Sequence, residues 1–137
     1  MKDTLQPGLS ATASFEVDRE RTIDFMGEAA RVYATPMLVR DIEIACRGLL
    51  LQHLDPGEDS VGTRVEIDHV GATLLGMPVT IVVRIVEVNG RAVTFEVEGR
   101  DPVETIARGR HSRFVVDIAK TAQRLAAKAQ KAQSIPR

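Results

Sequence analysis

The pair Asn89-Gly90, set between two runs rich in β-branched residues, constrains the fold of this chain more than any other feature. A two-residue hairpin turn of type I′ needs positive φ at both central positions, and asparagine and glycine adopt it most readily. Met77–Val88 and Arg91–Gly99 are therefore expected to be adjacent antiparallel strands. The turn would gather valines on one apolar face, with Val86 opposite Val93 and Val82 opposite Val97.

A long helix is expected over Met37–Leu54, because this stretch has no internal proline and ends at the turn-forming Asp55-Pro56-Gly57. Most of its apolar residues fall on one broad arc at about 100° per residue. Ile44 and Leu51 lie outside that arc. We therefore expect a helix that is buried on more than one side.

Three further strands are expected, over Ser10–Val17, Ser60–His69 and Glu104–Ile118, with a loop at Asp18–Tyr33 and an alanine-rich helix from Lys120. The loop is long enough to cover a site and to contain one helical turn. In the second strand, period two places one set of residues on the same face as His69, namely Val61, Thr63, Val65 and Ile67. The element order indicates an α+β fold in which one antiparallel sheet wraps around one apolar helix.

Composition limits the class of protein. The 137 residues suit a single domain, 1–137, in which about 120–137 form a C-terminal helix and tail. The formal net charge of −1 gives no general basic excess for nucleic-acid binding. The single cysteine, Cys46, and the lack of an apolar leader or membrane-length run predict a cytoplasmic protein without a membrane partner.

Glu43 is the first candidate for chemistry, because it lies at the edge of the apolar arc of the expected helix. A partly desolvated carboxylate there suits a general base or a nucleophile. Arg47 and Arg40 offer the alternative of an ordinary surface ion pair, since helical residues three or four apart commonly meet.

Thr35 and His69 are candidates with structural alternatives of their own. Thr35 precedes Pro36, which is typical of a helix N-cap followed by proline at the first helical position. Eight helical residues separate two positions by about 12 Å, so Thr35 would meet Glu43 directly only from a loop that folds back. His69 ends a strand on its core face, where an imidazole either shuttles a proton or simply bonds to the backbone. His53 and His111 have weaker claims.

No motif in the chain supports nucleotide, dinucleotide or metal chemistry: GxxxxGK[ST], GxGxxG, HExxH and paired CxxC are all absent from the sequence. We therefore expect no metal and no cofactor. Gly62 and Thr63 offer backbone N–H groups that a ligand could approach, although glycine in a strand also marks bulges.

Three stretches, VYATPMLVRDIEIAC, LDPGEDSVGTRVEIDHVGATLLGMPVTIVVRIVEVNGR and IARGRHSRFVV, together resemble the fluoroacetyl-CoA thioesterase family of hotdog-fold proteins. The resemblance runs from about Tyr33 to Val116. Six residues match the family pattern in order and without an evident gap: Thr35, Glu43, Gly62, His69, Gly76 and Arg113.

The resemblance implies a hotdog domain that pairs into a homodimer, or a higher homo-oligomer, with active sites at the interface. It also implies that Thr35, Glu43 and His69 are catalytic. Beside it, we expect Gly62 and Thr63 to contact the substrate and Arg113 to contact substrate or phosphate. The family's gating aromatic residues belong to the segment before Thr35, which here reads Met26-Gly27-Glu28-Ala29 and is shorter. We therefore expect an acyl group other than fluoroacetyl.

The resulting hypothesis is a thioesterase that hydrolyses a small acyl-CoA, with coenzyme A entering only as part of the substrate. Glu43 would attack the carbonyl or activate water, Thr35 would hold that carboxylate or the substrate, and His69 would assist the charge change. The alternative is a non-catalytic acyl-CoA-binding or sensing dimer in which Arg47 neutralises Glu43. A hotdog hydratase is disfavoured because no matching aspartate-histidine motif is present.

Overall fold

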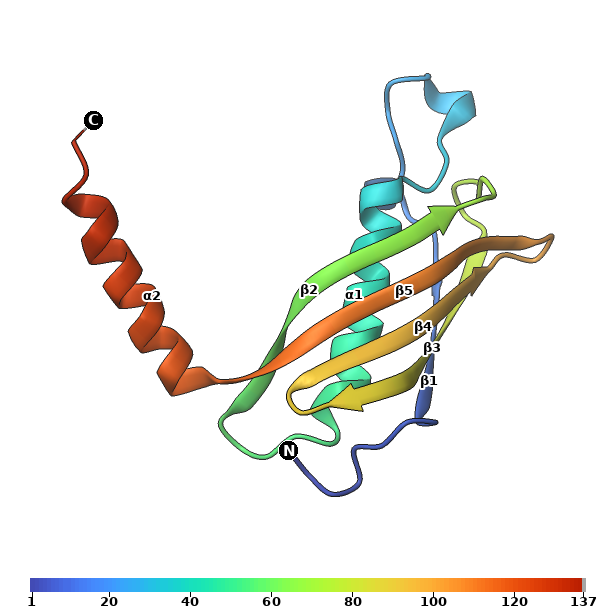
Figure 1. Cartoon of the computed structure of the whole chain (residues 1–137). Coiled ribbons are helices and arrows are strands. Elements are labelled where there is room, and N and C mark those ends of the chain that lie inside the picture. Colours follow the sequence, from blue (N-terminus) through green and yellow to red (C-terminus); the bar gives the residue numbers. More distant parts are fainter. Residues whose placement is uncertain (137) are drawn as a thin grey trace.

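The computed structural model describes residues 1–136, and it contains the predicted order of one strand, one long helix, four strands and a final helix (Figure 1). The prediction of a single domain over 1–137 includes Arg137, which lies outside the described residues. The elements are β1 Ser10–Glu16, α1 Thr35–Leu51, β2 Glu58–His69, β3 Pro78–Asn89, β4 Ala92–Arg100, β5 Thr105–Asp117 and α2 Ile118–Gln133.

The strands form one antiparallel sheet in the order β1-β3-β4-β5-β2, and the sheet curves around α1 (Figure 1). The core lies between α1 and the inner face of the sheet, which explains why α1 is apolar over a broad arc. Its fully buried members come from both layers and include Leu38, Ile42, Leu50, Ile81, Ile85 and Phe95. β2 forms one edge of the sheet, and α2 projects away beyond it (Figure 1).

The β3–β4 hairpin is present, but its predicted turn and register are wrong. Asn89 pairs with Ala92, so Gly90 and Arg91 are the turn residues. Gly90 alone has positive φ there, at 60°, which fits a type II′ turn rather than type I′. Val82 therefore faces outward opposite Glu98, and the buried face instead carries Val79, Ile81, Val83 and Ile85. A bulge between Ile85 and Glu87 shifts the pairing of β3 with β4 by one residue near the turn.

A β-bulge between Gly62 and Arg64 also changes the predicted faces of β2. Val61 pairs with Phe114, and both are substantially exposed on the outer face of the sheet. Beyond the bulge the alternation is reversed, so Val65 pairs with the buried His111 on the inner face. The prediction that Val61 and His69 share one face is therefore wrong, because one extra residue lies between them.

Helix α1 begins at Thr35, two residues earlier than predicted, and ends at Leu51. Ala34 is the N-cap and makes no side-chain hydrogen bond, so the interpretation of Thr35 as the N-cap is wrong. Thr35 lies in the first turn of α1, and it does not fold back from a loop. Its distance from Glu43 is therefore set by helical rise.

The segment between β1 and α1 contains two 3₁₀ turns, Arg19–Arg21 and Glu28–Ala30, where a single helical turn was expected. A buried polar contact fixes this segment to α1: the guanidinium of Arg21 donates to Asp41 with its Nε at 2.9 Å. The Tyr33 hydroxyl donates to the same carboxylate. None of the described helices is both long and apolar enough to cross a membrane.

Candidate active site

Thr35 and His69 lie side by side where the first turn of α1 meets the end of β2. Thr35 Oγ1 is 2.8 Å from His69 Nδ1, within hydrogen-bonding distance. His69 Nε2 is buried and has no hydrogen-bond partner among the described residues. Burial lowers the pKa of His69, with only partial opposition from the Gly71 backbone, so the imidazole is neutral near pH 7. A neutral imidazole with one unengaged nitrogen is suited to proton transfer.

A cavity of about 350 Å³ opens next to this pair. The segment before α1 supplies the apolar side chains of its wall, and the turn after β2 supplies largely backbone. The lining residues are Ile23, Phe25, Val32, Tyr33, Thr35, His69, Val70, Gly71 and Ala72. Phe25 is 77% exposed, so one aromatic ring of the segment stands at the open rim of the cavity. The sequence interpretation singled out Met26 to Ala29 in this segment and gave Phe25 no role at the site.

Glu43 lies in a different environment, at the middle of α1 and facing β5. Its Oε1 is 3.6 Å from Arg113 Nη1 and 3.8 Å from His111 Nε2. The expected ion pair with Arg47 is absent, because Arg47 donates two hydrogen bonds to Asp59, at 2.9 and 2.7 Å. Arg40 approaches Asp41 instead, at 3.8 Å. Arg47 therefore does not neutralise Glu43, and the Glu43 side chain is 39% exposed.

Gly62 faces the Glu43 carboxylate directly. A Cβ at this position would lie 2.5 Å from Glu43 Oε1, so only glycine leaves room for the carboxylate where it lies. The next residue, Thr63, is in the bulge, and its hydroxyl donates to the Ser112 carbonyl at 3.2 Å. The predicted contact of Gly62 and Thr63 with substrate remains a prediction, and Gly62 has a clear structural relation to Glu43.

Arg113 is buried on the inner face of β5, where it contacts other protein groups. Its Nε donates to Ser60 Oγ at 2.7 Å and its Nη2 donates to the Ser60 carbonyl at 2.9 Å. Burial lowers the pKa of Arg113, and the charge of Glu43 opposes this. The predicted contact of Arg113 with substrate or phosphate remains a prediction, and three of its nitrogens already face Ser60, His111 and Glu43.

The three residues predicted to be catalytic thus form two groups within one chain. Thr35 contacts His69, whereas Glu43 lies eight residues farther along α1, a separation of about 12 Å. A substrate carbonyl that contacts Thr35 and His69 does not reach Glu43 of the same chain unless the chain moves. A second copy of the chain could instead supply the glutamate.

His111 was missed as a neighbour of Glu43, although the sequence contains a signal for it. His111, Arg113 and Val115 alternate along the last strand, so they share a face, and Val115 is fully buried. Two polar residues on the same strand face as a core valine indicate a buried polar cluster. The sequence interpretation considered His111 only beside Arg110, Ser112 and Arg113 and gave it a weaker claim.

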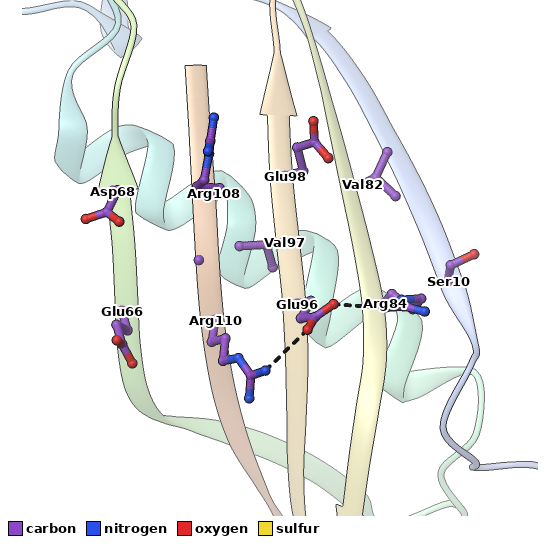
Figure 2. A pocket seen from close by; sticks show the side chains of 11 residues that line it. Ser10, Glu66, Asp68, Val82, Arg84, Glu96, Val97, Glu98, Arg108 and Arg110 are labelled. Carbon is purple, nitrogen blue, oxygen red and sulfur yellow. Dashed lines mark hydrogen bonds and ion pairs between the residues drawn. The ribbon is translucent and has the colours of Figure 1, made fainter. Parts of the chain in front are cut away.

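A larger hollow of about 900 Å³ lies on the outer face of the sheet, away from α1 (Figure 2). Its charged side chains alternate in sign from strand to strand, and Glu96 bonds both Arg84, at 2.8 Å, and Arg110, at 3.3 Å (Figure 2). This hollow contains none of the predicted site residues. Two of its arginines, Arg84 and Arg110, are paired with Glu96, so we place the candidate active site on the α1 side. Within residues 1–136, no group of three or more His, Cys, Asp or Glu is arranged to hold a metal ion.

Comparisons of this chain with known proteins point to one family of thioesterases. Residues 17–119 match a family model described as FlK, fluoroacetyl-CoA-specific thioesterase. The fluoroacetyl-CoA thioesterase of Streptantibioticus cattleyicolor is 32% identical over 127 residues, which cover 88% of this chain and 91% of that protein.

Solved structures show the same fold. A crystal structure of FlK covers 98% of this chain and 100% of its own, with 30% identity and a TM-score of 0.82. A mutant of FlK in complex with fluoroacetate and CoA covers 85% of this chain and 99% of its own, with 31% identity and a TM-score of 0.79. A thioesterase superfamily member of Thermus thermophilus covers 97% and 99%, with 27% identity and a TM-score of 0.88. The predicted hotdog fold is confirmed.

Proposed function

This chain belongs to the FlK family of fluoroacetyl-CoA-specific thioesterases, and we propose that it hydrolyses the thioester bond of a small acyl-CoA. The activity class follows from the family: the chain is a thioesterase. The observation that carries the proposal for this chain is the Thr35–His69 pair, 2.8 Å apart beside a cavity of about 350 Å³. A cavity of that size suits a small acyl group and the thioester carbonyl.

The proposed reaction consumes water and releases a carboxylic acid and a free thiol. Glu43 either attacks the carbonyl carbon, forming an acyl-enzyme anhydride that water then cleaves, or takes a proton from the attacking water. His69 supports the developing charge on oxygen or protonates the departing sulfur, and Thr35 fixes the His69 ring. Backbone N–H groups near Gly62 would stabilise the oxyanion, which is worth roughly 10²–10³ in rate per donor in measured cases.

The acyl group is proposed from the cavity wall. Ile23, Phe25 and Val32 give it an apolar side, so an uncharged short acyl chain fits better than a charged one. We propose that this chain is not specific for fluoroacetyl, since the segment before α1 brings one phenylalanine, Phe25, to the cavity.

We further propose that two copies pair through the free edge of β2. This edge exposes Val61 at 46% and Val65 at 45%, and Ile44 of α1 is exposed at 54%. Apolar side chains on an edge strand with unpaired backbone groups favour addition of another strand. Antiparallel pairing of two β2 strands would place the His69 end of one strand near the Glu58 end of the other. Such pairing supports a site shared between copies, with Glu43 from one and Thr35–His69 from the other.

The activity is tested by thiol release from a panel of acyl-CoA substrates, with wild type compared with Glu43→Gln. The proposal expects turnover of at least one short apolar acyl-CoA by wild type and a loss of about 10²-fold or more in Glu43→Gln. Equal rates for the two proteins would remove Glu43 from the mechanism. Lack of turnover on every thioester would remove the substrate proposal.

The shared site has its own test, in which inactive Glu43→Gln and His69→Asn proteins are unfolded, mixed in equal amounts and refolded. About half of the refolded dimers then contain one copy of each variant. If the site is shared, one of the two sites in each such dimer has both wild-type residues, so the mixture recovers about one quarter of wild-type activity. A site built within one copy gives no recovery at all.

Because only Cys46 is present and it is buried, a reducing cytoplasmic location is also proposed.

A further inference from the structure

His111 is a buried imidazole whose protonation pattern is fixed by the backbone. Its Nδ1 lies 2.7 Å from the carbonyl oxygen of Arg64, in the neighbouring strand β2. A carbonyl only accepts hydrogen bonds, so Nδ1 carries the proton and donates. In the neutral ring this leaves Nε2 with a lone pair. Burial lowers the pKa of His111, which keeps the ring neutral near pH 7.

The lone pair of His111 Nε2 faces Arg113 Nη1 at 3.1 Å, so the imidazole accepts from the guanidinium. The other side of the guanidinium is held by Ser60, through Nε at 2.7 Å and Nη2 at 2.9 Å. The planar guanidinium is therefore gripped on two sides, and its orientation is fixed. Nη1 is left between His111 and Glu43.

The contact with Glu43 is one of charge, and it leaves the carboxylate free. Arg113 Nη1 is 3.6 Å from Glu43 Oε1, which is within ion-pair range and beyond a good hydrogen bond. The carboxylate is thus attracted into the space above Gly62 while its lone pairs stay available. A direct bidentate bond to arginine would instead engage both oxygens.

We propose that His111 is a positioning residue that, through Arg113, holds the Glu43 carboxylate over Gly62 in its reactive orientation. This proposal rests on the proposed function of Glu43. His111 itself touches no substrate, because its side chain is fully buried behind Arg113. The groups that face its ring are Arg64 of β2, Arg113 of β5, Glu43 of α1 and the stacked ring of Phe95 in β4, with centroids 6.4 Å apart.

Two substitutions separate the two hydrogen bonds of His111. In His111→Asn, the amide nitrogen takes the place of Nδ1 and keeps the bond to the Arg64 carbonyl, but no acceptor reaches Arg113. In His111→Gln, the longer side chain brings its amide oxygen to the place of Nε2 and keeps an acceptor for Arg113. His53→Asn is the matched control, because His53 bonds Thr4 Oγ1 at 2.8 Å on the protein surface.

The expected result is a fall of about 10-fold in kcat for His111→Asn, with KM changed by less than about twofold and partial recovery of kcat in His111→Gln. His53→Asn should match wild type in every measurement. The kcat and KM values come from steady-state thiol release, with thermal unfolding measured alongside.

The two levels of the proposal fail separately. Wild-type activity in Glu43→Gln would overturn the proposed role of Glu43, on which this proposal rests. A wild-type kcat in His111→Asn, together with an inactive Glu43→Gln, would overturn the role of His111 alone. If His111→Asn does not fold, Arg113→Lys supplies the test, because lysine keeps the charge but cannot bond Ser60 twice and still face Glu43. A wild-type kcat in Arg113→Lys would likewise overturn the proposal.

Discussion

Replacing Gly62 by alanine tests whether the position of the Glu43 carboxylate matters, without removing any functional group. The new Cβ would lie 2.5 Å from Glu43 Oε1, 3.2 Å from His111 Cε1 and 3.5 Å from Arg113 Nη1. Unstrained carbon–oxygen contacts begin at about 3.3 Å, so the carboxylate must move by about 0.8 Å. The other two contacts need little or no adjustment.

The expected effect is large on catalysis and small on stability. A displacement of about 1 Å in a reacting group costs up to roughly 10²-fold in rate, or about 2.7 kcal/mol of transition-state stabilisation. The atom that moves is the end of a flexible side chain that is 39% exposed, so the fold adjusts easily. We expect the free energy of unfolding to change by less than about 1 kcal/mol.

Two other glycines supply controls in the same chain. A Cβ at Gly48 in α1 would meet no neighbouring side chain within 4 Å, so Gly48→Ala should keep activity and stabilise the helix by about 0.5–1 kcal/mol. A Cβ at Gly109 would lie 2.0 Å from the Glu66 carbonyl oxygen, so Gly109→Ala should destabilise the sheet. Thiol release and thermal unfolding are measured for all three. Wild-type kcat in Gly62→Ala would refute the reasoning, and so would a loss of stability like that of Gly109→Ala.

Three further predictions concern stability. Because burial lowers the pKa values of His69 and His111 below about 6.5, the unfolded chain binds more protons as pH falls, and the free energy of unfolding should decrease below pH 6.5 by up to about 1.4 kcal/mol per pH unit for each histidine. Urea unfolding between pH 5 and 7 measures this, and a flat profile would contradict it. Tyr33→Phe should cost about 1–3 kcal/mol in thermal unfolding, since the buried Asp41 loses a donor. Removal of the chain after Ala119 should change unfolding by under about 0.5 kcal/mol, because no residue of α2 is buried; a larger loss would show that α2 packs against another chain.

The order of elements could be predicted because turn residues and periodicity are local properties. The Asp55-Pro56-Gly57 turn follows α1 as expected, and a hairpin joins β3 to β4 as expected, although its turn residues are Gly90 and Arg91. The faces of β3 could not be predicted, since adjacent residues such as Val82 and Val83 are equally apolar. Packing against α1 decides which of them is buried, and that information is not local.

For the candidate site too, local patterns did not show which residues meet. Thr35 and His69 meet because a helix start and a strand end lie together, which the family resemblance implied and local patterns did not. The neighbours of Glu43 come from β5, a strand that lies about 70 residues away in the sequence. Only the strand order β4-β5-β2 shows that β5 passes beneath the middle of α1.

The bulge at Thr63 links the fold to the site. Gly62 and His69 are seven positions apart, and in an unbroken strand an odd separation places two side chains on opposite faces of the sheet. In this structure both face α1: Gly62 lies against Glu43, and His69 lies against Thr35. The single unpaired residue between Gly62 and Arg64 restores the shared face. Simple alternation placed His69 correctly on the face toward α1 but placed Gly62 on the opposite face. The extra residue in the bulge therefore allows one strand, β2, to contribute to both parts of the site.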